Sequence, residues 1–166
     1  LAGFTGVGRR MEARGTVAGV AVVDDYAHHP AEIRATLQAA RERRPARVLV
    51  VFQPHLPSRT RALGGELAEA LGAADVVVVT DVYLAREPAD PEATGRGVAD
   101  RVPGPARAVH APTLAEAADL ILAEARPGDL VITMGAGDVT ALGQELVAAL
   151  GKTTRDGSTH ERTAPA

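Results

Sequence analysis

The 166-residue chain contains no cysteine and no tryptophan, and its aromatic residues are limited to two phenylalanines and two tyrosines. Without cysteine, neither a disulfide framework nor a thiolate metal site is possible. Single-stranded nucleic acid is an unlikely partner, because its bases need aromatic side chains to stack on. The formal net charge of −3 also argues against nucleic acid as the main partner.

Long apolar runs are absent as well. The longest have the length of a β-strand, far below the roughly 20 residues that a membrane-spanning helix needs, so no membrane partner is expected. No signal peptide is visible, and the lack of cysteine gives no indication of an oxidising compartment. Because the chain begins at Leu1 and not at a methionine, we also expect further sequence upstream.

Short apolar segments rich in β-branched residues alternate with longer segments of helical periodicity. The sequence predicts five strands, at residues 20–24, 47–52, 75–80, 106–110 and 130–134. Alternation of this kind predicts an α/β fold, a Rossmann-like three-layer sandwich with a mainly parallel sheet of about six strands. A short strand within residues 8–14, followed by a turn that Gly15 and Gly19 bracket, would add an antiparallel edge hairpin.

The domain is expected to span residues 9–150. The glycine-rich residues 1–8 are interpreted as a linker from missing upstream domains. Residues 151–166 are polar and lack hydrophobic periodicity, so we expect a last helix that ends at Leu150 and then a disordered tail. A helix at residues 92–102 is only weakly predicted, because each of its two glycines costs about 1 kcal/mol relative to alanine.

A polar cluster, Asp24-Asp-Tyr-Ala-His-His-Pro30, lies between the first long strand and the helix that Pro30 opens. Such a junction is the carboxyl end of a parallel strand, where ligands bind and helix N–H groups face anions. Asp24 and Asp25 could bind a ribose hydroxyl or a metal-bound phosphate, or one of them could cap the helix. His28 and His29 could contact phosphate or transfer protons, or could simply be exposed loop residues.

A second cluster, Gln53-Pro-His-Leu-Pro-Ser-Arg-Thr60, follows the next strand. His55, Ser58 and Arg59 should therefore emerge at the same edge of the sheet as the first cluster. Arg59 can bind a carboxylate or a phosphate through two parallel hydrogen bonds. The alternative is a surface arginine in the first turn of a helix, where a positive charge is mildly unfavourable.

Neither phosphate-binding motif in the chain is complete. Gly135-Ala-Gly-Asp138 allows close backbone approach, but Thr140 replaces the third glycine of the dinucleotide fingerprint, so a tight turn is the simpler interpretation. Gly151-Lys-Thr153 imitates the end of a P-loop, yet Leu146 replaces the first glycine and the segment follows a helix. Several strands of the chain end in polar residues, yet the chain has no complete P-loop. This combination predicts half of an active site.

In this order and spacing, the segments at residues 24–30, 52–60 and 135–138 resemble the C-terminal domain of the ATP-dependent Mur ligases. Gly8-Arg-Arg10 matches the point where that domain begins. The His-His-Pro and Phe-Gln-Pro-His sequences resemble in particular the member that joins L-alanine to UDP-N-acetylmuramate. The ligase that recycles murein tripeptide is the alternative within the family. A non-catalytic module that binds nucleotide or amino acid is the alternative outside it.

The resemblance implies that the chain is the last third of a three-domain cytoplasmic enzyme of peptidoglycan precursor synthesis. Upstream UDP-binding and ATPase domains would bind most of the ATP and Mg²⁺, so the isolated domain is expected to be inactive. The complete enzyme would phosphorylate the muramoyl carboxylate with ATP. The amine of L-alanine would then attack the acyl phosphate.

The resemblance also assigns roles to six residues, although none is a certain catalytic residue and none is a metal ligand. The residues expected to face the nucleotide are Arg10, Asp25 and His28, and those expected to form the L-alanine pocket are Tyr26, His55 and Arg59. Arg59 would bind the alanine carboxylate. Two residues depart from the family pattern: Leu56 stands where some relatives have another arginine, and Pro57 replaces an aromatic residue.

Overall fold

The computed structural model describes residues 10–157. Its strands are β1 (Glu12–Val17), β2 (Val20–Asp25), β3 (Val48–Phe52), β4 (Val76–Val79), β5 (Arg107–His110) and β6 (Leu130–Met134). Its helices are α1 (Pro30–Glu42), α2 (Pro57–Leu71), α3 (Gly95–Ala99), α4 (Leu114–Glu124) and α5 (Leu142–Gly157), with a 3₁₀ turn η1 (Asp138–Ala141) before α5. None of the helices in this part of the chain is both long enough and apolar enough to span a membrane.

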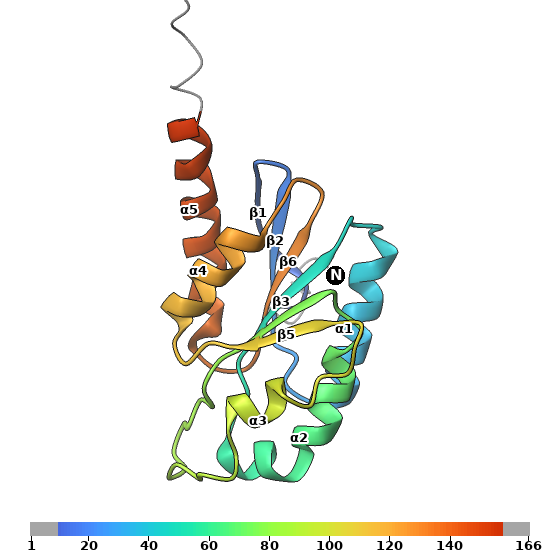
Figure 1. The fold of residues 1–166 in the computed structure, drawn as a ribbon, viewed down its shortest axis with the longest axis vertical. Coiled ribbons are helices and arrows are strands. Elements are labelled where there is room, and N and C mark those ends of the chain that lie inside the picture. Colours follow the sequence, from blue (N-terminus) through green and yellow to red (C-terminus); the bar gives the residue numbers. More distant parts are fainter. Residues whose placement is uncertain (1–9, 158–166) are drawn as a thin grey trace, which may run out of the picture.

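The strands form one sheet in the order β1-β2-β6-β3-β4-β5 (Figure 1). Only the β1–β2 pair is antiparallel, and every other neighbouring pair is parallel. The predicted α/β fold with a mainly parallel sheet and an antiparallel edge hairpin is therefore confirmed. Strand β6, the last strand within residues 10–157, lies between β2 and β3, so the centre of the sheet joins residues that are far apart in sequence.

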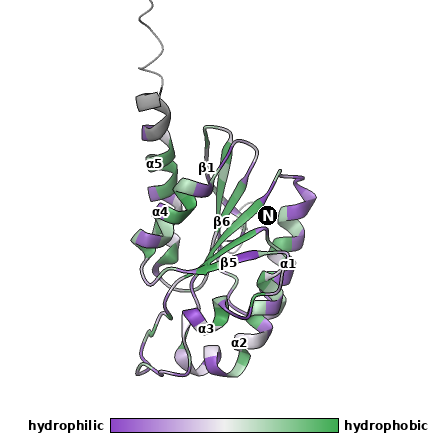
Figure 2. Ribbon diagram, viewed as in Figure 1, coloured by the Kyte–Doolittle hydropathy of each residue, from purple (hydrophilic) through white to green (hydrophobic). Residues whose placement is uncertain are grey.

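Helices cover both faces of the sheet. Side chains alternate along β3: Val50 and Phe52 pack with α1, α2 and α3, whereas Leu49 and Val51 pack with α4 and α5. Because both faces of β3 are covered, its residues are all buried, as a strand in the middle of a parallel sheet requires. Figure 2 shows the same division, with hydrophobic strands inside and hydrophilic residues on the outer faces of the helices.

The edge hairpin differs in detail from the prediction. Strand β1 continues to Val17, so Gly15 lies within the strand and not in the turn. The pairing with β2 shifts between Ala13 and Gly15, which marks a bulge. A Cβ atom at Gly15 would lie 3.1 Å from a methyl carbon of Val147, so glycine at this position lets α5 pack closely on β1. Gly19, with φ of 77°, occupies the turn as predicted.

The final helix also extends beyond the predicted end. Helix α5 runs to Gly157, whereas the sequence predicts an end at Leu150 and a disordered tail from residue 151. A single glycine costs a helix only about 1 kcal/mol, and no proline follows Gly151 before Pro165 to terminate it. The rest of the predicted tail, residues 158–166, and the predicted linker, residues 1–8, lie outside the described residues.

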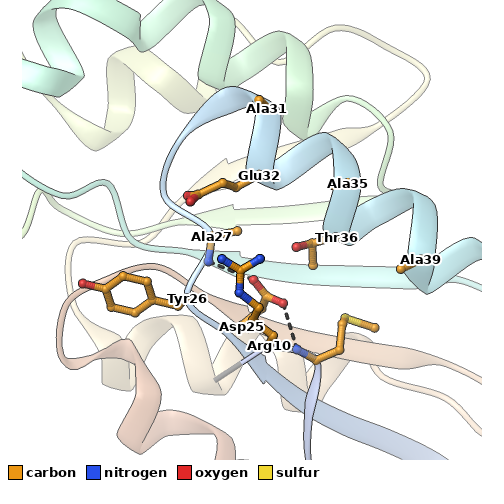
Figure 3. Close-up of a pocket in the computed structure, with 10 residues that line it drawn as sticks. Arg10, Asp25, Tyr26, Ala27, Ala31, Glu32, Ala35, Thr36 and Ala39 are labelled. Carbon is orange, nitrogen blue, oxygen red and sulfur yellow. Dashed lines mark hydrogen bonds between the residues drawn. The ribbon is translucent and has the colours of Figure 1, made fainter. Parts of the chain in front are cut away.

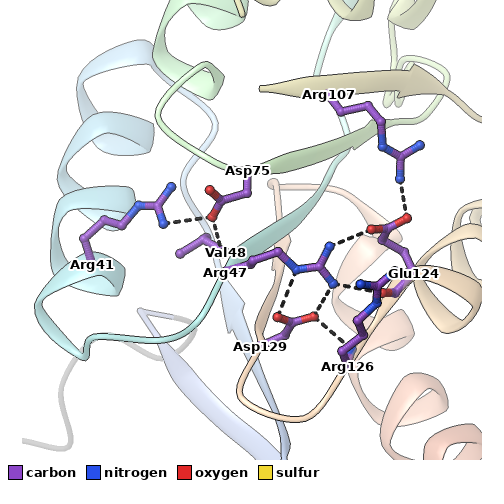
Figure 4. Close-up of polar contacts among 8 residues, drawn as sticks. All are labelled: Arg41, Arg47, Val48, Asp75, Arg107, Glu124, Arg126 and Asp129. Atoms are coloured by element: carbon purple, nitrogen blue, oxygen red, sulfur yellow. Dashed lines mark hydrogen bonds and ion pairs between the residues drawn. The ribbon is translucent and has the colours of Figure 1, made fainter. Parts of the chain in front are cut away.

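Charged residues join the amino ends of the strands, opposite the edge where the sequence predicts a site (Figure 4). Arg47, just before β3, contacts Asp129 before β6 at 2.7 Å and Glu124 at the end of α4 at 2.6 Å. Glu124 also binds Arg107 at the start of β5, at 2.5 Å. We call these four residues the Arg47 cluster. It ties three strands and one helix together at their ends.

Candidate functional site

Four rings form a row at the carboxyl edge of the sheet. Tyr26 and His28 follow β2, His55 follows β3 and Tyr83 follows β4. The ring centroids are 5.0 Å apart for Tyr26 and His28, 6.0 Å for His28 and His55, and 5.6 Å for His55 and Tyr83. Segments that are separate in sequence therefore bring their rings together, as the parallel strands require.

The proton on the His28 imidazole can be placed from its hydrogen bonds. Nδ1 lies 2.9 Å from the carbonyl oxygen of Tyr26. A carbonyl oxygen only accepts, so Nδ1 carries the proton and donates. Nε2 is then the ring nitrogen that can contact a ligand.

The start of helix α1 is capped by Glu32, not by either aspartate of the first cluster. The backbone N–H groups of His28 and His29 both donate to Glu32 Oε2, at 3.1 and 3.2 Å. His29 is the N-cap residue and is exposed, which agrees with its interpretation as a loop histidine. The alternative that Asp24 or Asp25 caps this helix is wrong, because both carboxylates are bound elsewhere.

His55 has the opposite proton placement. Arg59 Nη1 lies 3.4 Å from His55 Nδ1, and a guanidinium only donates, so Nδ1 accepts and Nε2 carries the proton. Burial lowers the pKa of His55, the positive charges of Arg59 and His28 lower it further, and Glu87 opposes them. His55 is therefore neutral near pH 7. With Nδ1 toward Arg59, the Nε2–H group of His55 can donate to a ligand at this edge.

Arg59 lies in the first turn of α2, and a carboxylate offsets its unfavourable position there. Glu87 accepts from the Ser58 N–H at 2.8 Å and from the Ser58 hydroxyl at 2.6 Å. These two hydrogen bonds lower the pKa of Glu87, burial opposes them, and the charges of Arg59 and His55 add to the lowering. The negative charge at this end also complements the helix dipole. Ser58 is thus at the predicted edge but is bound to Glu87.

Asp25 lies at the edge, beside a cleft that Arg10 also lines. Its two carboxylate oxygens accept from the backbone N–H groups of Met11 and Ala27, each at 2.8 Å. The cleft has a volume of about 400 Å³ and runs along α1 (Figure 3). Its lining also includes Tyr26, Glu32 and the small residues Ala31, Ala35 and Ala39. Since Tyr26 also belongs to the ring row, the cleft and the row adjoin.

Glu32 adds a second negative charge to the cleft. Burial raises the pKa of Glu32, but the hydrogen bonds from the His28 and His29 N–H groups and the charges of His28 and Arg10 outweigh that effect, so the pKa is lowered. The cleft is therefore lined by one cationic side chain, Arg10, and by two anionic ones, Asp25 and Glu32. Such a site can bind hydroxyl groups and phosphate oxygens at the same time.

Asp24 points away from this site. Its carboxylate accepts from Thr133 at 2.8 Å, Thr140 at 2.9 Å and Arg14 at 3.1 Å, and it is fully buried. It therefore links β1, β2, β6 and η1 within the domain. Of the two neighbouring aspartates, Asp25 lines the cleft and Asp24 does not.

The turn after β6 packs against the end of β3. A Cβ atom at Gly135 would lie 2.7 Å from the carbonyl oxygen of Gln53, which explains the glycine. The Gln53 amide donates to Asp138 at 2.6 Å and its oxygen accepts from the Val139 N–H at 3.2 Å. These contacts support the interpretation of Gly135-Ala-Gly-Asp138 as a tight turn.

The site also contains two residues that the sequence analysis missed, Tyr83 and Glu87. Tyr83 stacks on His55, and Glu87 binds the start of α2. One signal was available for Tyr83: it is one of only two tyrosines in the chain, and it follows a strand of four valines at the ligand-binding edge. No local pattern marks Glu87, since it contacts residues nearly thirty positions earlier.

Comparison with known proteins identifies the family. The family model described as "Mur ligase, glutamate ligase domain" matches residues 9–137, which is most of the chain. The chain belongs to the Mur ligase family. The resemblance noted in the sequence is confirmed, and the polar edge described above lies within the domain that this family shares.

Among Mur ligases, the chain is similar to alanine-adding members. A UDP-N-acetylmuramate–L-alanine ligase from a Nocardioides species is 58% identical over 90% of this chain and 34% of that protein. The enzyme of the same name from Kineococcus radiotolerans is 56% identical over 89% of this chain and 32% of that protein. The chain thus spans about a third of the length of these curated relatives.

Two solved structures of Mur ligases are similar to this chain. The UDP-N-acetylmuramate-alanine ligase of Thermotoga maritima is 30% identical, with a TM-score of 0.73 over 90% of this chain and 31% of that one. A murein peptide ligase from Psychrobacter arcticus is 24% identical, with a TM-score of 0.68 over 99% of this chain and 32% of that one. The second comparison shows a shared fold alone.

Proposed function

We propose that the chain is the C-terminal domain of an ATP-dependent, amide-forming ligase that joins L-alanine to UDP-N-acetylmuramate in peptidoglycan precursor synthesis. The observation that carries this proposal is the 58% identity to a ligase of that name over 90% of the chain. The complete enzyme would activate the muramoyl carboxylate as an acyl phosphate, which the amine of L-alanine attacks. Upstream UDP-binding and ATPase domains would complete the active site in a cytoplasmic protein.

We assign the L-alanine pocket to Tyr26, His55 and Arg59. The Arg59 guanidinium is within reach of His55 and lies at the ligand-binding edge, so it can pair with the carboxylate of the amino acid. The Nε2–H group of His55 supplies a second donor, and the exposed Tyr26 ring supplies an apolar wall. With Leu56 in place of a second cation, Arg59 would bear most of the carboxylate binding.

We assign the nucleotide contacts to Arg10, Asp25 and His28. Arg10 and Asp25 line the cleft along α1, where a guanidinium suits a phosphate and a carboxylate suits a ribose hydroxyl. His28 lies between this cleft and His55, which places it near both proposed ligands. These residues would act by positioning and by charge, as phosphoryl-transfer chemistry requires.

ATP in such a reaction needs Mg²⁺ to neutralise the phosphate charges. Among residues 10–157, no three histidine, aspartate or glutamate side chains are grouped so that they could bind a metal ion. In our proposal the ATPase domain of the complete enzyme supplies the metal ligands.

The proposal is tested with Arg59→Ala in the full-length protein. Loss of a charge-assisted hydrogen-bond partner should raise the KM for L-alanine roughly 10- to 100-fold and change the KM for ATP much less. Arg61→Ala is the matched control, because Arg61 lies in the same helix but pairs with the exposed segment at Asp90. Unchanged alanine kinetics in Arg59→Ala would contradict the role of Arg59.

The substrate that supplies the attacking amine distinguishes an L-alanine-adding ligase from a ligase that recycles murein tripeptide. The full-length protein is incubated with ATP, UDP-N-acetylmuramate and either L-alanine or murein tripeptide, and ADP release and product mass are measured. We expect turnover with L-alanine. Turnover with the tripeptide alone would favour the recycling ligase, and no turnover with either would favour a non-catalytic binding module.

A further inference from the structure

The segment at residues 81–87, which follows β4, runs beside the end of β3 and pairs with it. The Tyr83 N–H donates to the Pro54 carbonyl at 2.8 Å, and the Leu56 N–H donates to the Tyr83 carbonyl at 2.9 Å. These two bonds form a short parallel bridge between His55 and Tyr83. The loop that carries His55 is therefore held by main-chain contacts to a different part of the chain.

The Tyr83 ring is confined on two sides. It stacks on the His55 imidazole with a centroid distance of 5.6 Å and an interplanar angle of 17°. It also packs against Gly137 in the turn after β6, where an added Cβ atom would lie 2.8 Å from Tyr83 Cγ. Although Tyr83 remains 36% exposed, its position between these neighbours fixes the plane in which the His55 ring lies.

The backbone next to His55 adopts a conformation that its sequence does not favour. Leu56 has φ of 69°, in a region where a residue with a Cβ atom is disfavoured. Such a residue persists only where the surrounding structure holds it. The hydrogen bond from the Leu56 N–H to Tyr83 supplies this support at the point where the loop enters α2.

Both ends of the segment are fixed as well. Asp81 accepts a hydrogen bond from His110 Nε2 at the end of β5, at 2.7 Å. Glu87 binds Ser58 at the start of α2, directly before Arg59. The segment thus contacts His55 through Tyr83, and it contacts Ser58, the neighbour of Arg59, through Glu87. His55 and Arg59 are the two residues that we assign to the carboxylate of L-alanine.

We propose that Tyr83 is a positioning residue of the amino-acid pocket, because its ring and its backbone fix His55 with Nδ1 toward Arg59 and the Nε2–H group free for the ligand. This inference rests on the proposed function, which supplies the identity of the ligand. Tyr83 does not need to touch the amino acid: His55 lies between it and His28. The phenol oxygen is not required for stacking, so phenylalanine can replace tyrosine here.

Steady-state kinetics of the full-length enzyme test the inference. Tyr83→Ala should raise the KM for L-alanine roughly 3- to 10-fold, as expected for loss of one ring contact, and leave the KM for ATP within about twofold. Tyr83→Phe should restore the wild-type values. Leu84→Ala is the control, since Leu84 is an exposed neighbour in the same segment. A KM for L-alanine that is unchanged in Tyr83→Ala would overturn the inference.

A second measurement on the 166-residue chain does not depend on the substrate. The charged groups that act on His55 are Arg59, His28 and Glu87, and burial is the largest influence on it. Removal of the Tyr83 ring exposes the imidazole to water, so the NMR-detected pKa of His55 should rise in Tyr83→Ala and stay unchanged in Tyr83→Phe. Equal His55 titration in all three proteins would also overturn the inference.

The two measurements separate the inference from the proposed function. If the wild-type enzyme lacks alanine-dependent ADP release, the proposed function fails, and the His55 titration still decides whether Tyr83 positions that ring. If the wild-type enzyme is active and Tyr83→Ala matches it in either measurement, the inference alone fails. Thermal unfolding of each variant, followed by circular dichroism, shows that the comparison is made between folded proteins.

Discussion

The guanidinium of Arg47 and the carboxylate of Asp129 meet through two parallel contacts, Nε to Oδ1 at 3.2 Å and Nη2 to Oδ2 at 2.7 Å. Only 1% of the Asp129 side chain is exposed, against 27% for Arg47. The pair joins the amino ends of β3 and β6, two neighbouring strands in the centre of the sheet. It therefore stabilises the sheet at the end opposite the proposed active site.

Replacement of Arg47 by methionine should destabilise the domain strongly. The carboxylate of Asp129 would stay buried without its cation, and breaking a buried pair in this way costs about 3–5 kcal/mol. Urea denaturation of the chain measures the change in the free energy of unfolding. Arg34→Met is the control, because Arg34 forms an exposed pair with Glu69 and such pairs contribute about 0–1 kcal/mol. Equal losses in the two variants would contradict the role of the Arg47 cluster.

Glu124 should make the stability of the domain depend on pH. A hydrogen bond from Arg47 lowers the pKa of Glu124, burial opposes it, and the charges of Arg107, Arg47 and Arg126 add to the lowering. A carboxyl group of this kind stabilises the fold above its unfolded pKa of about 4.3, and the contribution is lost as the pH falls through the lower folded value.

Urea denaturation at a series of pH values below 6 detects this effect by comparison with Glu124→Gln, which cannot titrate. We expect the free energy of unfolding of the wild-type chain to fall more steeply toward acid than that of the variant. Parallel curves would show that Glu124 has the same pKa in the folded and unfolded chain.

Thr133→Val should weaken the buried contacts of Asp24. The Thr133 hydroxyl donates to Asp24 Oδ1 at 2.8 Å, and a hydrogen bond to a charged group contributes about 1.5–3 kcal/mol. Valine has nearly the same shape but no donor. Thr133→Ser, which keeps the hydroxyl and loses a methyl group, serves as the control in the same denaturation experiment. A smaller loss in the valine variant than in the serine variant would contradict this account.

Two glycine-to-alanine substitutions should change stability in opposite directions. A Cβ atom at Gly95 would lie 1.8 Å from the Thr80 carbonyl oxygen, so Gly95→Ala must displace backbone and destabilise the fold. Gly65 lies on the exposed side of α2 with no atom within 4 Å of an added Cβ, and alanine there should stabilise the chain by roughly 0.5–1 kcal/mol. Thermal unfolding of both variants is the measurement, and a gain in stability for Gly95→Ala would be the contrary result.

The sequence was sufficient for the strands and for most helices, because their signals are local. Four consecutive valines mark β4, and a Thr-x-x-Glu pattern marks the start of α4, where the Thr113 side chain accepts from the Glu116 N–H. The weakly predicted helix at residues 92–102 shortens to α3, and Gly95 is present for its contact with Thr80, which only the folded structure shows.

The candidate site was only partly accessible from sequence. The edge where His28, His55 and Arg59 meet follows from the parallel strands, so their proximity could be predicted. Strand position alone does not separate Asp24 from Asp25, and only the family resemblance singled out Asp25. The structure shows why Asp24 is turned away from the cleft: it is bound by Thr133, more than a hundred residues later. Tyr83 and Glu87 also depend on long-range contacts.

The position of β6 has a consequence for biosynthesis. Both neighbours of this strand, β2 and β3, are made long before it, yet neither pairs with the other. A chain still on the ribosome therefore lacks the strand that closes the middle of its sheet until nearly the whole domain has emerged. Pairing over such separations is slow, so we expect the middle of the sheet to be the last part to form.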